Sequence, residues 1–65
     1  MNFYDRVKEL AESQNKPLIK LLEENGIKYD SYKTARRQGY LLRTDESCKI
    51  AKALNTTVEY LVYGN

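Results

Sequence analysis

The chain has 65 residues, of which 42% are hydrophobic and 31% charged, with three glycines, one proline and a formal net charge of +2. A chain of this length buries only about 60% of its unfolded surface, which leaves little room to enclose a substrate and several catalytic groups. The balance of apolar and charged residues excludes a disordered chain. We therefore expect one domain, residues 1–65, that acts through its surface.

The residue types that metal sites and enzymes need are scarce. Cys48 is the single cysteine and histidine is absent, so the chain can form neither an internal disulfide nor a set of soft zinc ligands. Its serines have no histidine base, and three scattered glycines make no phosphate-binding loop. Stretches without charge reach six residues, against the 18 or more of a membrane span. We expect a cytoplasmic protein that is not an enzyme, with no metal, cofactor, small-molecule substrate or membrane contact.

The first part of the sequence predicts two helices. Asn2 can cap a helix over about 3–14, and Pro17 suits the first position of a second helix that ends near Asn25. Gly26 can adopt the left-handed conformation that closes a helix. The apolar residues expected to point inward from these two helices are Phe3, Val7, Leu10, Ala11, Leu18, Leu21 and Leu22.

After Gly26 the sequence predicts a third helix, from 28 or 29 to 37, that stops at Gly39. Tyr32, Ala35 and Arg36 are expected on its inner face, so most of its circumference is polar. The outward residues are Tyr29, Asp30, Lys33, Thr34 and Arg37. Such a helix presents a large polar surface to solvent or to a partner.

Two more helices are expected in the last third of the chain. Thr44 can cap a helix that ends near Asn55, and Thr57 can cap a short helix over 58–63 that Gly64 closes. Leu41 and Leu42, in the connector before Thr44, are expected in the core. The inward residues expected from the fourth helix are Cys48, Ile50, Ala51 and Leu54. No strand of useful length is predicted, so the fold class is all-α with five helices.

The charges are unevenly distributed. Residues 27–43 hold five basic residues and one acid, a net charge of +4, whereas residues 1–26 and 44–65 are each at −1. A basic segment between mildly acidic ones is typical of a nucleic-acid footprint in an otherwise neutral domain. The alternative is a solvated helix face.

A short helix, a turn at Gly26 and a polar, basic helix form the layout of a helix-turn-helix, over about 17–37. The stretch from Lys49 to Leu61, KIAKALNTTVEYL, and the opening RVKEL at 6–10 add to it. In these residues the chain resembles the lambda-repressor-like family of phage repressors, Cro proteins and small bacterial regulators, over residues 3–64. The resemblance implies a compact five-helix domain with a helix-turn-helix, formed by its second and third helices.

The same resemblance implies sequence-specific binding of double-stranded DNA through the major groove by a transcriptional regulator, most of all a phage or prophage type repressor. The alternative is a protein–protein interaction module that retains the fold without binding DNA. Three features favour this alternative: the modest net charge, the acid Asp30 in the third helix, and Leu18 where the family often has a phosphate-binding Gln.

The family reads bases with the N-terminal part of its third helix, which implies that the base-contacting residues here are Tyr29, Asp30, Lys33 and Thr34. Lys33 and Thr34 match positions that touch bases in relatives, a Lys to guanine and a Thr to a thymine methyl. Asp30 accepts a hydrogen bond from cytosine N4, caps the helix or is a neutral surface residue, and the last two roles are favoured over the first. Tyr29 can reach a base or phosphate, or lie over the protein surface.

Phosphate contacts are expected at the ends of the third helix and just beyond it, where the DNA backbone passes. The residues expected to make them are Lys28, Ser31, Arg37, Gln38, Tyr40 and Arg43. Arg36 points more inward than Arg37 in this assignment, so an ion pair with an acid of a neighbouring helix suits it as well as a DNA contact does.

A dimer surface is expected near the C-terminal turn, because relatives bind as dimers on half-sites about 34 Å apart. Residues 58–63 hold five apolar or aromatic residues in six positions, more than one buried face of a short helix can use. We expect a weak homodimer through Val58, Leu61, Val62 and Tyr63. The alternative is a monomer in which this turn is fully buried.

Overall fold

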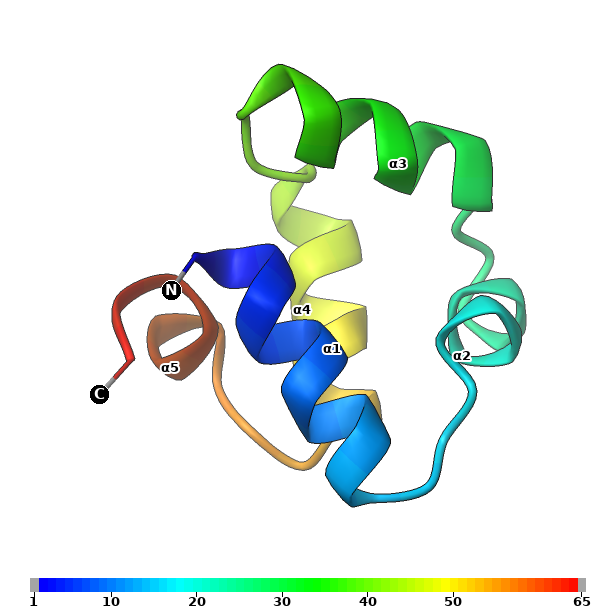
Figure 1. Cartoon of the computed structure of the whole chain (residues 1–65), viewed down its shortest axis with the longest axis vertical. Coiled ribbons are helices and arrows are strands. Elements are labelled where there is room, and N and C mark those ends of the chain that lie inside the picture. The colour runs from blue at the N-terminus through cyan, green and yellow to red at the C-terminus, as the bar shows by residue number, and fades with distance from the viewer. Residues whose placement is uncertain (1, 65) are drawn as a thin grey trace.

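A computed structural model describes residues 2–64, which form five α-helices and no strand (Figure 1). The helices are α1 (Phe3–Ser13), α2 (Leu18–Glu24), α3 (Tyr29–Gln38), α4 (Thr44–Ala53) and α5 (Val58–Tyr63). The predicted all-α class is therefore confirmed for this part of the chain, and the predicted helix bounds hold to within about two residues. None of these helices is long and apolar enough to cross a membrane.

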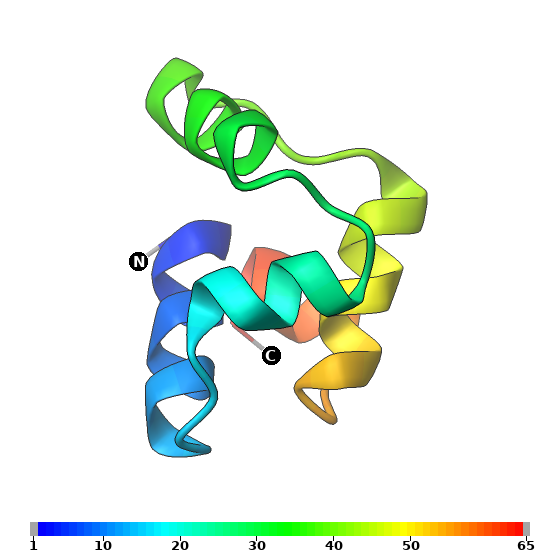
Figure 2. The ribbon, with the colours of Figure 1, turned by 90° about the vertical axis from the view of Figure 1, so that its right-hand side faces the viewer.

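The helices surround one core. α1 and α4 run in the same direction as two uprights, with α2 and α5 on opposite sides of the space between them (Figures 1 and 2). α3 lies across one end of this arrangement, with one side toward the other helices (Figure 1). The connectors before and after α3 therefore fix its orientation relative to the other four helices.

Side-chain caps fix two helix starts as the sequence predicts. The Asn2 side chain accepts a hydrogen bond from the Asp5 amide at 2.9 Å, and the Asp5 carboxylate accepts one from the Asn2 amide at 3.3 Å. Thr57 accepts a bond from the Tyr60 amide at 3.0 Å. The prediction for Thr44 is wrong, because Arg43 is the N-cap of α4 and its side chain makes no capping bond. Pro17 is likewise the N-cap of α2, one residue before the helix.

Left-handed residues close the helices. Gly26 has a φ of 72° and Gly39 a φ of 81°, as the predicted stop signals require. Asn15 and Asn55 also have positive φ angles, both 56°, and they end α1 and α4. Asparagine tolerates this conformation better than most residues.

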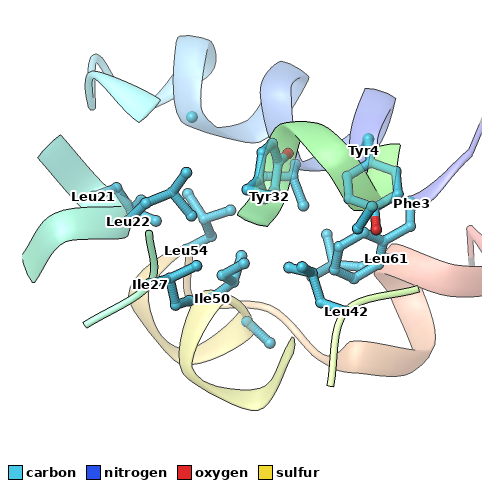
Figure 3. Packing of buried hydrophobic residues seen from close by; sticks show 14 residues of the cluster. Phe3, Tyr4, Leu21, Leu22, Ile27, Tyr32, Leu42, Ile50, Leu54 and Leu61 are labelled. Carbon is cyan, nitrogen blue, oxygen red and sulfur yellow. The ribbon is translucent and has the colours of Figure 1, made fainter. Parts of the chain in front are cut away.

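All five helices contribute to the core (Figure 3). The large side chains that are almost completely buried are Val7, Leu22, Ile27, Tyr32, Ile50, Leu54 and Leu61. The Tyr4 and Tyr32 rings meet edge to face with centroids 5.2 Å apart, which joins α1 to α3. Tyr4 was not expected in the core. Leu10 and Leu18, expected to point inward, are half-buried and pack against its edge.

The inward predictions for Cys48, Leu41 and Arg36 are wrong. Cys48 is exposed, and Ser47 is buried in its place. Ser47 lies three and four residues before Ile50 and Ala51, which is helical spacing, whereas Cys48 is two residues before Ile50 and faces elsewhere. In the connector before α4, Leu42 is buried as predicted but Leu41 is 53% exposed.

Side chains from α1 and the turn after it bind backbone carbonyls of distant segments. Arg6 donates to the carbonyls of Leu61 and Val62, each at 3.1 Å, at the end of α5. Near the end of α4, Gln14 donates to the Leu54 carbonyl and Lys16 to the Ala53 carbonyl. The Tyr4 hydroxyl donates to the Tyr40 carbonyl at 2.6 Å. The bonds from Arg6, Gln14 and Lys16 satisfy carbonyls that the ends of α5 and α4 leave without intrahelical partners. The bond from Tyr4 holds the connector after α3 in place.

Candidate nucleic-acid interface

α3 is anchored to the core by few residues. Tyr32 and Ala35 are its buried residues, and Tyr29 is half-buried against the core edge. At about 100° per residue, Tyr32 and Ala35 occupy one narrow side of the helix. The rest of α3 is therefore available to a partner.

One flank of α3 carries cations. Arg36 was expected on the inner face, but it is exposed, as are Lys33 and Arg37. Lys33 follows Tyr29 by four residues, Arg36 follows Lys33 by three and Arg37 follows Lys33 by four, which places these residues on one flank, called here the basic stripe. Lys33 lies over the Tyr29 ring, with its Nζ 5.1 Å from the ring centroid.

The cations of the basic stripe have no ion pair among residues 2–64, where the one ion pair joins Arg43 Nε to Asp45 Oδ1 at 3.4 Å. The ion pair considered for Arg36 with a neighbouring helix is therefore not formed. Helical spacing alone does not place Arg36, because it lies four residues after the buried Tyr32 as well as three after the exposed Lys33. A flank with unpaired cations attracts anions.

The other flank of α3 borders a groove of about 480 Å³, called here the α3 groove. Asp30, Ser31 and Thr34 line one wall, and the connector with the first turn of α4 forms the other. The residues that line the groove are Asp30, Ser31, Thr34, Ala35, Tyr40, Leu41, Leu42, Arg43 and Glu46. The four residues expected to contact bases thus divide, with Tyr29 and Lys33 on the basic stripe and Asp30 and Thr34 in the α3 groove.

Asp30 does not cap α3. The N-cap residue is Lys28, and no side chain makes a capping hydrogen bond there. Asp30 is exposed in the first turn, where its charge still interacts favourably with the helix dipole. The capping hydrogen bond is therefore not formed, and the exposed position of Asp30 fits both a cytosine contact and a neutral surface residue.

The residues expected to contact phosphate lie around both ends of α3. Lys28 and Gln38 are exposed at its two ends, and Arg37 is exposed on the basic stripe. Ser31 lines the α3 groove, away from the stripe. Arg43, also in the groove, is exposed and paired with Asp45.

Tyr40 follows Gly39 with 57% of its surface exposed, while the Tyr4 hydroxyl holds its carbonyl. Burial raises the pKa of Tyr4, the nearby Tyr40 adds to this effect, and a backbone hydrogen bond at Leu42 opposes it. Burial also raises the pKa of Tyr32 well above its usual range, against the opposing effect of the Arg36 guanidinium. Both hydroxyls are therefore neutral at ordinary pH, and Tyr4 holds the connector as a neutral donor.

The predicted dimer surface is smaller than the sequence suggested. Leu61 is completely buried in the core, so its assignment to an interface is wrong. Val58 and Val62 are half-buried against the core, and Tyr63 is 72% exposed. α5 therefore buries Leu61 completely and Val58, Tyr60 and Val62 in part, and leaves Tyr63 as its exposed apolar residue.

The chain matches no protein-family model, no curated protein and no solved structure in the comparisons made. Support for a function therefore comes from the charge, exposure and shape of the α3 surface. That surface offers cations, a phenol and hydroxyls on one helix, groups that donate hydrogen bonds to phosphate oxygens and to base edges.

Proposed function

We propose that the chain is a sequence-specific, double-stranded DNA-binding domain that acts as a transcriptional regulator of the phage repressor type. In this proposal α2 and α3 form a helix-turn-helix, and α3 enters the major groove. The observation that carries the proposal is the basic stripe, whose cations are exposed and unpaired among the described residues on a helix at one edge of the molecule (Figure 1).

The dimensions of α3 suit this role. Its ten residues span roughly 15 Å at 1.5 Å per residue, and the major groove of B-DNA is about 12 Å wide and accepts an α-helix. Because α3 makes few core contacts, the side chains on its other sides are free to contact the walls and floor of the DNA major groove. In this proposal Lys28, exposed at the start of α3, and Tyr40, exposed beyond its end, contact the two flanking DNA backbones.

Salt-dependent binding tests the proposal. We expect affinity for a random duplex to fall between about 50 and 200 mM salt with a logarithmic slope near −0.9Z, where Z is about 4. A variant with Arg36→Gln and Arg37→Gln should lower Z by about 2. Fluorescence anisotropy of a labelled duplex measures both slopes.

The matched control carries Lys8→Gln and Lys52→Gln, which remove two exposed cations from α1 and α4 and leave α3 intact. This variant should retain the wild-type slope to within about one phosphate contact. Equal losses in the two variants, or a wild-type affinity that does not respond to salt, would contradict the proposal.

The α3 groove favours a second candidate, a protein-interaction module. Its walls hold the carboxylates of Asp30 and Glu46, and Tyr40 and Leu41 expose apolar surface beside them. Such a groove suits a basic segment with apolar side chains. Under this candidate the chain would bind protein and show no steep salt-linked affinity for duplex DNA.

A weak homodimer through α5 remains part of the proposal. Tyr63 offers the exposed apolar surface, with the outer parts of Val58 and Val62. This area is small beside the roughly 800 Å² per partner of a stable interface, so association should require high concentration or DNA. Sedimentation of the wild type and of Tyr63→Lys across concentration tests it. A wild type that stays monomeric and binds palindromic DNA without cooperativity would exclude this dimer.

A further inference from the structure

Asp30 is the one acidic residue of α3, and it is exposed beside the α3 groove. Lys33 lies three residues later, at a spacing that allows an ion pair, but it lies over the Tyr29 ring instead. Within residues 2–64 the Asp30 carboxylate makes no ion pair, and it makes no capping bond to α3. The carboxylate is thus exposed to solvent, with no ion pair or capping bond to the protein, on the surface proposed to meet DNA.

A carboxylate on this surface is repelled by phosphates unless a base donates a hydrogen bond to it. In the major groove the donors are the amino groups of cytosine (N4) and adenine (N6). The adenine amino group lies beside the N7 acceptor, which repels a carboxylate, whereas cytosine presents no acceptor at its major-groove edge. The chemistry of an ionised, acceptor-only side chain therefore selects cytosine.

We propose, building on DNA binding by α3, that Asp30 reads a C·G pair by accepting a hydrogen bond from cytosine N4. The unpaired state of Asp30 in the free protein is then part of recognition, because no ion pair has to break before the base is bound. The position of Lys33 over Tyr29 keeps its ammonium on the basic stripe, on the opposite flank from the α3 groove.

Selection of bound duplexes from a random pool tests the reading. The wild type should enrich sites with cytosine fixed at one position. The Asp30→Asn variant should change that position to adenine, since asparagine pairs with both N6 and N7 of adenine. The control Glu12→Gln makes the same change of charge at an exposed residue in the last turn of α1, at the far end of the molecule from α3 (Figure 1). It should select the wild-type site.

A chemical probe then isolates the hydrogen bond. N4-methylcytosine at the selected position keeps its pairing hydrogen and places the methyl group where the major-groove donor was. We expect wild-type affinity to fall about tenfold on this duplex, in the range of one good base contact. The Asp30→Ala variant has no acceptor to lose, so it should bind the methylated and unmethylated duplexes equally.

The outcomes separate the two proposals. If Asp30→Asn and Asp30→Ala select the same cytosine as the wild type, Asp30 does not read it, although DNA binding by α3 stands. If Asp30→Ala only tightens binding to every duplex alike, Asp30 is a repulsive surface charge and the inference is wrong. If the wild type enriches no sequence, sequence-specific binding itself fails, and the reading of cytosine fails with it.

Discussion

α3 and α4 are helices of equal length, ten residues each, but α4 packs a full side against the core and α3 is mostly exposed. α4 buries Ser47, Ile50 and Ala51 and is followed by the buried Leu54, so a full side of the helix faces the core. α3 buries only Tyr32 and Ala35. The difference shows that four inward positions at helical spacing make α4 a core helix, whereas two inward positions leave α3 as a surface helix.

Charge follows the same division. α4 carries two acids in its first turn and two lysines further on, so its charges balance and suit its dipole. α3 carries three cations and one acid. Substitutions in α4 should therefore change mainly the free energy of unfolding, and substitutions on the outer side of α3 should change mainly binding.

The largest effect is expected for Ile50→Ala. Ile50 is completely buried, and removing its side chain should cost about 2–5 kcal/mol of the free energy of unfolding. Denaturant unfolding followed by circular dichroism measures this loss. The neighbouring exposed Lys49→Ala should change stability by less than about 0.5 kcal/mol. Equal losses at the two positions would show that α4 does not face the core as described.

Substitutions on the exposed side of α3 should change DNA binding and leave the free energy of unfolding nearly unchanged. Lys33→Ala or Thr34→Ala should change which sequence is preferred, by about 1–3 kcal/mol for a good base contact, with the free energy of unfolding nearly unchanged. Arg37→Ala should weaken binding to all duplexes alike, as a lost phosphate contact does. Competition binding on selected and random duplexes checks the three variants. The same loss on both duplexes for all three would mean that α3 does not read sequence.

The turn between α2 and α3 should show a smaller effect. Gly26 has a φ of 72°, and apart from Gly26 and its two chain neighbours no described residue has an atom within 4 Å of the place where a Cβ would be. Gly26→Val should therefore destabilise through the backbone alone, by about 1–2 kcal/mol. Gly26→Asn should cost less, because asparagine tolerates this conformation. A melting temperature that valine leaves unchanged would contradict the role of this turn.

Alkaline pH should give the smallest effect. The pKa of Tyr32 is raised in the folded state, so the folded protein holds this proton more tightly than the unfolded chain does. The contribution is fully present below the unfolded pKa of about 10 and is lost as pH rises above it. Tyr32→Phe should flatten the fall of the melting temperature above about pH 10, whereas Tyr63→Phe, at an exposed position, should not. Parallel curves for the three proteins would exclude this role of Tyr32.

Local signals predicted the helix ends well. The Asn2 and Thr57 caps and the Gly26 and Gly39 turns depend on residues within a few positions, so the sequence contains all that determines them. The prediction for Cys48 failed because its spacing is ambiguous: Cys48 lies three residues before the buried Ala51 but only two before the buried Ile50, at the edge of the buried side.

Long-range contacts left no such signal. The bond from Tyr4 to the Tyr40 carbonyl joins residues 36 apart in the chain, and its formation depends on how α1 and α3 pack. The basic character of α3 was evident from the sequence, but the division between the basic stripe and the α3 groove was not. That division depends on the path of residues 39–43, which only the folded chain defines.

The most direct test of the central claim, that α3 is the DNA-binding helix, is a titration of the isotope-labelled chain with duplex DNA, followed by amide NMR. We expect the largest shift changes within 28–43, over α3 and the connector after it, and small changes at the end of α1 and in α5. Shift changes centred on α2 or α5 with α3 unaffected, or no changes at any residue, would contradict the account.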